Sequence, residues 1–245
     1  MPQSLNASRV AIVTGGSRGI GRQVVRRLAA DGFTVVVNYA GNQAEADAAV
    51  GEAGGDSYAA QADVADDAAI AELFEQAEHR LGGIDVLVHA AGKLALAPLV
   101  DLDLAVLDDV HRINIRGTFV VDQQAARRLR PGGAIVNFST SVVGTAFPTY
   151  GAYTASKGAI EALTMVLARE LRGRDVTVNA VAPGPTATEL FLDGKDQATI
   201  DRLAAAVPLE RLGSPADIAE VVAFLTSPAG HWVNGQVLRA NGGLV

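Results

Sequence analysis

Tyr153 and Lys157 lie four residues apart in the stretch YGAYTASKGAIEAL, which has the pattern of an amphipathic helix. Residues at positions i and i+4 share one helix face, so the phenol and the ammonium can reach the same cleft. A neighbouring cation favours the phenolate and lowers the pKa of tyrosine from about 10. The pair therefore predicts an acid/base that works near neutral pH. A tyrosine and a lysine with this spacing are more often a packed side chain and a solvated one, so the prediction depends on other motifs.

A hydroxyl group precedes this helix in the stretch NFSTSVVG, at the end of a predicted strand. Ser141 is placed to hold a substrate oxygen against the phenol of Tyr153.

A glycine-rich turn follows the first predicted strand in TGGSRGIGRQVV, with glycines at 15, 19 and 21. Glycine permits a tight turn and a close approach of the backbone to a diphosphate, and the helix that follows presents free N–H groups to that anion. The spacing differs from G-x-G-x-x-G, but the strand, turn and helix supply the context of a dinucleotide site.

The second predicted strand, FTVVVNYAGN, ends at Asn38 rather than at an acidic residue. Sites for NAD usually carry a carboxylate there, which binds the ribose 2′-hydroxyl and repels a 2′-phosphate. Arg18 can supply the opposite charge, so we expect NADP(H) to be favoured over NAD(H); the alternative is that Arg18 points into solvent. Asp63 ends the third strand and either binds the adenine amino group or caps the next helix.

Short apolar runs alternate with helical patterns along the chain, which predicts βαβ units. The seven runs lack polar alternation, as expected of strands covered on both faces. They are RVAIVTGG, TVVVNY, DSYAAQAD, DVLVHAAG, AIVNFST, VTVNAVAP and QVLRA. We expect an α/β fold, a single doubly wound Rossmann domain over residues 1–245 with a seven-stranded parallel sheet. A helix is expected over 103–130. The irregular segment 183–200 predicts a mobile substrate lid around 185–207; the alternative is an ordinary surface loop.

The composition excludes several classes of function. With 27 acidic and 20 basic residues the net charge is −7, which disfavours a nucleic-acid partner. The absence of cysteine excludes disulfides and thiolate chemistry. The chain has no apolar run long enough for a membrane span and no export signal, so we expect no membrane partner and a cytoplasmic location. The four histidines, at 79, 89, 111 and 231, lack metal-ligand spacing, so no metal site is expected.

Eight motifs occur in order: TGGSRGIG, DV at 63–64, HAAG at 89–92, IN ending at Asn114, STSVVG, YTASK, NAVAPG and NGQVLRANGG. In these the chain resembles the short-chain dehydrogenase/reductase family over nearly its whole length. The resemblance implies that Tyr153 is the acid/base, that Lys157 binds the ribose and lowers the phenol pKa, that Ser141 positions the substrate and that Asn114 holds a water in a proton relay. The cofactor contacts that it implies are Gly15, Ser17, Arg18, Gly19, Ile20, Gly21, Asn38, Asp63, Val64, Ala90, Ala91, Gly92, Tyr153, Lys157, Pro183, Gly184, Thr186 and Thr188.

The sequence departs from the family pattern at two motifs. HAAG replaces the usual N-N-A-G, so Ala90 lacks an asparagine side chain, and Asn241 replaces a frequent aspartate. Ser139 is an alternative to Ser141 but lies two residues early relative to the family's S-V-V-G.

Among subfamilies the chain is most similar to the 3-oxoacyl-[acyl-carrier-protein] reductases, which implies NADPH-dependent reduction of a ketone in a 3-oxoacyl thioester. The alternatives are a broad carbonyl reductase or alcohol dehydrogenase acting on small ketones, and a cofactor-sensing protein without turnover. Substrate specificity is expected to reside in 94–101, 144–151 and 185–207. The resemblance also implies a homotetramer, with the 103–130 and Tyr153 helices as its faces.

Five arginines lie near two predicted helix ends. They form either a basic patch for an acidic acyl carrier protein or ordinary solvated helix ends. They are Arg127, Arg128, Arg130, Arg172 and Arg174.

Overall fold

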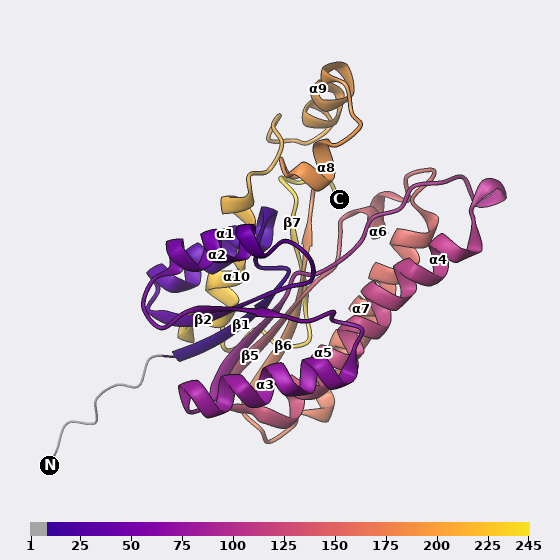
Figure 1. Cartoon of the computed structure of the whole chain (residues 1–245). Coiled ribbons are helices and arrows are strands. Elements are labelled where there is room, and N and C mark those ends of the chain that lie inside the picture. Colours follow the sequence, from indigo (N-terminus) through magenta and orange to yellow (C-terminus); the bar gives the residue numbers. More distant parts are fainter. Residues whose placement is uncertain (1–8) are drawn as a thin grey trace, which may run out of the picture.

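Seven parallel strands form one sheet in the computed structural model, which describes residues 9–245 (Figure 1). The spatial order is β3-β2-β1-β4-β5-β6-β7, so the chain moves outward in one direction as far as β3 and then returns to the other side of β1. The strands are β1 (Arg9–Thr14), β2 (Phe33–Tyr39), β3 (Tyr58–Gln61), β4 (Ile84–His89), β5 (Leu129–Phe138), β6 (Val176–Pro183) and β7 (Val237–Ala240). The predicted doubly wound α/β fold is confirmed.

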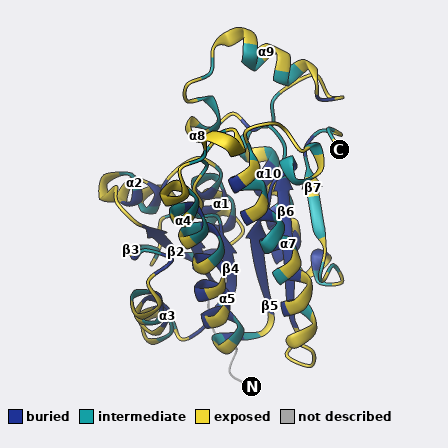
Figure 2. Ribbon diagram, turned by 90° about the vertical axis from the view of Figure 1, so that its right-hand side faces the viewer, coloured by how far each residue is buried: buried dark blue, intermediate teal, exposed yellow. Residues whose placement is uncertain are grey.

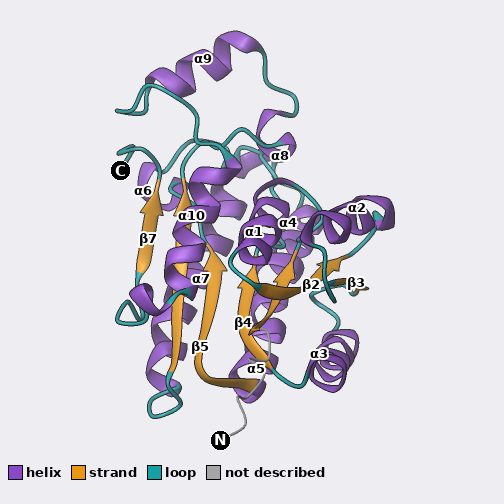
Figure 3. Cartoon of the chain, turned by 90° about the vertical axis from the view of Figure 1, so that its left-hand side faces the viewer, coloured by secondary structure: helices purple, strands orange, loops and turns teal. Residues whose placement is uncertain are grey.

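Helices cover both faces of this sheet (Figures 1 and 3). One face carries α1 (Gly19–Ala30), α2 (Gln43–Ala53) and α10 (Pro215–Thr226), and the other carries α3 (Asp67–Leu81), α5 (Gly117–Arg128) and α7 (Gly151–Glu170). The remaining helical elements are α4 (Leu104–His111), α6 (Val142–Thr145), α8 (Glu189–Leu192) and α9 (Gln197–Ala205), with short turns at Leu99–Asp101 and Pro228–Gly230.

The apolar strands form two cores because successive side chains point to opposite faces of a sheet. Val13 and Val136 pack beneath α1 and α10, whereas their neighbours Ile12 and Ile135 pack beneath α3, α5 and α7. All four are fully buried, as the central strands in Figure 2 show. Burying one such side chain contributes about 1.5–3 kcal/mol, which explains why these strands carry no polar alternation.

The predicted 103–130 helix is not one regular α-helix. Its backbone forms α4, then a π-helical turn η2 (Arg112–Arg116), and then α5, which ends at Arg128. The hydroxyl of Thr118 donates to the carbonyl oxygen of Asn114 at 2.6 Å, inside the altered turn. Such π-turns are frequent at functional sites, and this one places Asn114 beneath the end of β4.

The predicted lid contains two short helices, α8 and α9, rather than irregular chain throughout. Side-chain oxygens of Thr188 and Asp196 accept backbone N–H groups at their N-termini. The segment projects beyond the edge at which the strands end, at the top of Figure 1. Its mobility stays a prediction.

No helix in the described part of the chain is long and apolar enough to cross a membrane.

Candidate active site

A cavity of about 780 Å³ lies at the carboxyl edge of the sheet, the edge at which the strands end. Such an edge is the usual place for a ligand in an open α/β sheet. Among the predicted site residues, Asn114 alone does not line this cavity. Those that do are Gly15, Ser17, Arg18, Gly19, Ile20, Gly21, Asn38, Asp63, Val64, Ala90, Ala91, Gly92, Ser141, Tyr153, Lys157, Pro183, Gly184, Thr186 and Thr188.

In the glycine-rich turn, the backbone of one residue packs directly against the backbone of another. Gly15 has φ of +63°, and a Cβ on it would lie 2.9 Å from the Cα of Ala91. A Cβ on Gly21 would overlap the carbonyl oxygen of Gly15. The turn therefore needs glycine, and it leaves the N-terminus of α1 facing the cavity as a cradle for a diphosphate.

The end of β2 differs from the prediction by one residue. The strand continues to Tyr39, and the side-chain amide of Asn38 donates to the carbonyl oxygens of Ala60 (3.2 Å) and Ala62 (3.0 Å). Asn38 is therefore a buried link between β2 and β3, and its amide is not free to bind a phosphate. The residue at the strand end, Tyr39, also lacks a carboxylate, and the exposed Arg18 lines the same cavity.

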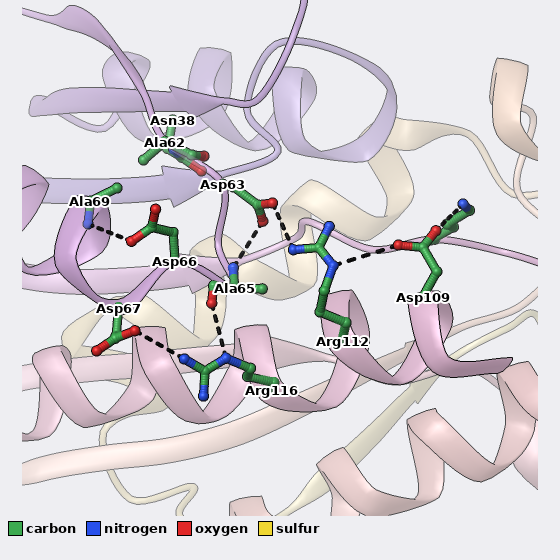
Figure 4. Close-up of polar contacts among 11 residues, drawn as sticks. Asn38, Ala62, Asp63, Ala65, Asp66, Asp67, Ala69, Asp109, Arg112 and Arg116 are labelled. Atoms are coloured by element: carbon green, nitrogen blue, oxygen red, sulfur yellow. Dashed lines mark hydrogen bonds and ion pairs between the residues drawn. The ribbon is translucent and has the colours of Figure 1, made fainter. Parts of the chain in front are cut away.

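Asp63 is held by two donors on neighbouring elements (Figure 4). Its carboxylate accepts the N–H of Ala65 at 2.9 Å and Nη1 of Arg112 at 2.7 Å. Burial acts to raise the pKa of Asp63, but these two hydrogen bonds outweigh it and lower the pKa. Asp66, not Asp63, caps α3, so the capping alternative is wrong. Adenine binding by Asp63 stays a prediction.

Tyr153 and Lys157 both line the cavity from α7. Nζ of Lys157 donates to the carbonyl oxygen of Phe138 at 2.7 Å and lies 5.8 Å from the centroid of the Tyr153 ring. Burial lowers the pKa of Lys157 to about 8. Burial also raises the pKa of Tyr153 to about 12, while a hydrogen bond with the Thr140 side chain lowers it. Without a dinucleotide, burial therefore dominates the pKa of the phenol. Its lowering by Lys157 stays a prediction for the dinucleotide-bound protein.

Asn114 supports the site from beneath. Its side chain exchanges two hydrogen bonds with the backbone of Lys93 (2.8 and 2.9 Å) and donates to Oγ of Ser156 at 2.9 Å. A Cβ on Gly92 would lie 3.4 Å from both Oδ1 of Asn114 and Nζ of Lys157. Asn114 thus fixes the loop after β4 against α7, and its part in a proton relay stays a prediction.

The three consecutive hydroxyl residues after β5 have different partners. Ser139 donates to Oε1 of Glu161 at 2.6 Å. Ser141 donates to the carbonyl oxygen of Ala182 at 3.1 Å and accepts Nδ2 of Asn241 at 2.9 Å. The hydroxyl that reaches Tyr153 belongs to Thr140. The sequence motif pointed to Ser141, and nothing in three adjacent hydroxyl residues identified Thr140.

His89, in the HAAG motif, is a buried side chain of the core. It is 1% exposed, and its Nδ1 lies 2.7 Å from the hydroxyl of Thr14. Burial, together with the charge of Lys157, lowers the pKa of His89 to about 3, so the ring is neutral. Within residues 9–245, no group of three or more His, Cys, Asp or Glu side chains is arranged to hold a metal ion.

The cavity has an apolar wall. Phe147 and Tyr150 form an edge-to-face pair with ring centroids 6.1 Å apart. Further apolar side chains on this wall are Leu94, Val142, Leu190, Phe191, Leu203 and Leu244. Apart from Val142 and the C-terminal Leu244, these residues come from the three segments predicted to set specificity.

The arginines that suggested a carrier-protein patch do not border the cavity. They lie at the C-terminal ends of α5 and α7 or just after them, near the first residues of β5 and β6, whereas the cavity lies where those strands end. Leu129 at the start of β5 pairs with Ile84 and Asn137 near its end pairs with His89, so the two ends of β5 lie at opposite ends of β4. Arg128 pairs with Glu75 and Glu78, Arg130 pairs with Asp85, and Arg174 donates to backbone carbonyls. These residues therefore lie away from the cavity, and a carrier-protein patch formed by them stays a prediction.

Comparisons with known proteins agree with this site. A family model described as "Enoyl-(Acyl carrier protein) reductase" matches residues 15–245. The chain is 43% identical to a short-chain type dehydrogenase/reductase of Picea abies (97% of this chain, 92% of the relative). It is 40% identical to NADPH-dependent aldehyde reductase 2, chloroplastic, of Arabidopsis thaliana (97% and 94%) and 37% identical to 3-oxoacyl-[acyl-carrier-protein] reductase FabG of Staphylococcus aureus (98% and 99%). A solved short chain dehydrogenase of Burkholderia cenocepacia in complex with NADP superposes with a TM-score of 0.91 at 36% identity, over 98% of both chains.

Proposed function

Since the chain belongs to the short-chain dehydrogenase/reductase family and is an NADP-dependent enzyme of that family, we propose that it reduces the carbonyl group of a ketone or an aldehyde to an alcohol. The observation that carries this proposal is the placement of Tyr153 and Lys157 in the same cavity as the glycine-rich turn. Carbonyl reduction requires a proton donor and a dinucleotide-binding turn that face the same cavity.

NADPH, when bound, supplies the hydride that adds to the carbonyl carbon. Tyr153 donates its phenolic proton to the carbonyl oxygen, so the C=O double bond becomes one C–H bond and one O–H bond. The buried ammonium of Lys157 stabilises the phenolate that remains until a proton from water restores the phenol. One carbonyl compound, one NADPH and one proton thus give one alcohol and one NADP⁺.

NADPH is the proposed reductant rather than NADH. The end of β2 carries Tyr39 where a carboxylate would repel a 2′-phosphate, and Arg18 lines the same cavity. The relative from Arabidopsis and the complex from Burkholderia, both named for this dinucleotide, support the proposal.

A small carbonyl compound with an apolar body is the proposed substrate. The apolar wall with the Phe147 and Tyr150 rings favours such a body. The aldehyde reductases among the relatives support the same choice.

A 3-oxoacyl thioester is the second candidate. The relative FabG and the description of the matching family model favour it. The distant position of the arginines removes the support that a basic docking patch would have given. A homotetramer and a cytoplasmic location stay predictions for either candidate.

The test is the oxidation of NADPH by the purified protein with three kinds of substrate: small ketones, aldehydes with an aromatic or aliphatic body, and acetoacetyl thioesters. We expect turnover, with kcat/KM higher for the free carbonyl compounds than for the thioesters. A preference for the thioesters would reverse the order of the two candidates. NADPH binding without turnover of any compound would instead support a cofactor-sensing protein.

A further inference from the structure

Thr140 stands between two serines whose hydroxyl groups already have partners. Ser139 donates its proton to Glu161 on α7. Ser141 donates to the carbonyl oxygen of Ala182 and accepts from Asn241. To bind a substrate oxygen, either serine would have to give up its hydrogen bond to a carboxylate or to a backbone carbonyl, whereas the partner of the Thr140 side chain is the phenol of Tyr153 itself.

Asn241 determines the direction of the Ser141 hydroxyl. Nδ2 of Asn241 can only donate a hydrogen bond, so Oγ of Ser141 accepts it. The hydroxyl proton of Ser141 must then be donated to another group. That proton meets the carbonyl oxygen of Ala182, a residue of β6. The asparagine that departs from the family pattern therefore holds Ser141 turned toward the sheet.

The hydroxyl group of Thr140 has a different set of partners from that of Ser141. Its Oγ1 accepts the backbone N–H of Val142 at 3.3 Å, which leaves the hydroxyl proton to be donated. The side chain reaches the phenol of Tyr153 and lines the cavity. A carbonyl oxygen placed to receive the proton of Tyr153 would therefore also meet the hydroxyl of Thr140.

We propose that Thr140, not Ser141, is the residue whose hydroxyl donates a hydrogen bond to the carbonyl oxygen of the substrate beside Tyr153. This assignment rests on the proposed carbonyl reduction. It makes Thr140 a catalytic residue that holds the oxygen in line with the phenol as negative charge develops on it.

The test compares four variants in the full chain. Thr140→Val removes the hydroxyl but keeps the shape, and Thr140→Ser keeps the hydroxyl. Ser141→Ala removes the alternative hydroxyl. Thr164→Val is the matched control, because Thr164 is buried on α7 and its hydroxyl has no partner among the described residues. NADPH fluorescence and circular dichroism establish that each variant is folded and binds the dinucleotide.

We expect Thr140→Val to lower kcat by about 100-fold, with Thr140→Ser restoring most of it and Thr164→Val leaving it unchanged. Ser141→Ala should lower kcat far less than Thr140→Val. A loss in Ser141→Ala that equals or exceeds the loss in Thr140→Val would return the role to Ser141 and overturn the proposal.

A second measurement does not require turnover. Removing a hydrogen bond to the phenolate raises the pKa of a phenol. In the NADP⁺-bound protein, phenolate absorbance, corrected with a Tyr153→Phe variant, should show a higher Tyr153 pKa in Thr140→Val than in the native protein. An unchanged pKa would count against Thr140 even if no substrate were found. Failure of the proposed function, in contrast, would appear as a native protein that turns over no carbonyl compound.

Discussion

The ammonium of Lys157 lies 5.8 Å from the ring centroid of Tyr153 and donates its hydrogen bond to the carbonyl oxygen of Phe138. The four-residue spacing brings both groups to one cavity, as expected for one helix face. The hydrogen bond of the ammonium goes to a backbone carbonyl and not to the phenol. The acidity of Tyr153 therefore depends on what else enters the cavity, above all the positive charge of an oxidised nicotinamide.

Replacing Tyr153 with Phe removes the proton donor and little else, because the ring and its packing remain. We expect kcat for carbonyl reduction to fall by about 10²–10⁴-fold, with NADPH affinity close to that of the native protein. Steady-state kinetics and a fluorescence titration measure the two quantities. Retained turnover would reject Tyr153 as the acid.

Replacing Lys157 with Met should stabilise the protein without dinucleotide while abolishing its activity. The ammonium is 4% exposed and its pKa falls from 10.5 to about 8, which corresponds to a cost of roughly 3 kcal/mol for the charged form. The folded state binds fewer protons than the unfolded state between pH 8 and 10.5, so native stability rises with pH in that window. Urea unfolding should show the largest gain from Lys157→Met below pH 8 and a shrinking gain toward pH 10.5. A gain that does not change with pH would contradict the assignment of a buried ammonium.

Asp122 and Asn137 form a buried pair outside the cavity, between α5 and β5, and a substitution here tests the electrostatics of the core. Nδ2 of Asn137 donates to Oδ2 of Asp122 at 2.8 Å, and the other oxygen of each side chain has no partner among the described residues. Burial raises the pKa of Asp122 from 3.8 to about 7, so native stability falls as pH rises through that window.

Asp122→Asn should therefore stabilise the protein at pH 8 by roughly 2–4 kcal/mol and much less near pH 4. The new amide can donate to the unpartnered oxygen of Asn137, and it carries no charge. Asp122→Ala, which leaves Asn137 without its acceptor, is the control and should destabilise at both pH values. The free energy of unfolding in urea measures the effect, and destabilisation by Asp122→Asn at pH 8 would contradict it.

The preference for NADPH should reside at Arg18 and at the end of β2. Arg18→Ala should weaken NADPH binding by about tenfold, or roughly 1.4 kcal/mol, with little effect on NADH. Tyr39→Asp adds a carboxylate that repels a 2′-phosphate and can accept the 2′-hydroxyl, so it should favour NADH. Titrations of both dinucleotides against each variant check this. Equal losses for NADPH and NADH in Arg18→Ala would mean that the arginine does not contact the 2′-phosphate.

The doubly wound sheet and most of the cavity wall could be predicted from the sequence. Apolar runs without polar alternation predicted seven strands, of which the edge strands β3 and β7 are only partly buried, and the glycines at 15 and 21 marked a turn in which a Cβ would meet backbone. Strand burial and turn geometry constrain residues that are neighbours in the sequence, so they can be recognised from a short stretch of it. The same holds for Tyr153 and Lys157, whose common helix face follows from their spacing alone.

How the individual polar groups are used follows from the folded structure and not from the sequence pattern. Asn38 looked like the end of a strand but bonds to the neighbouring strand β3, and Ser141 is held by Asn241, which lies 100 residues further along the chain. The arginines after two helices proved to stand at the far end of the sheet from the cavity. Hydrogen-bond partners and burial, which set the pKa of Tyr153, depend on segments distant in sequence that pack together, and no spacing within one segment encodes them.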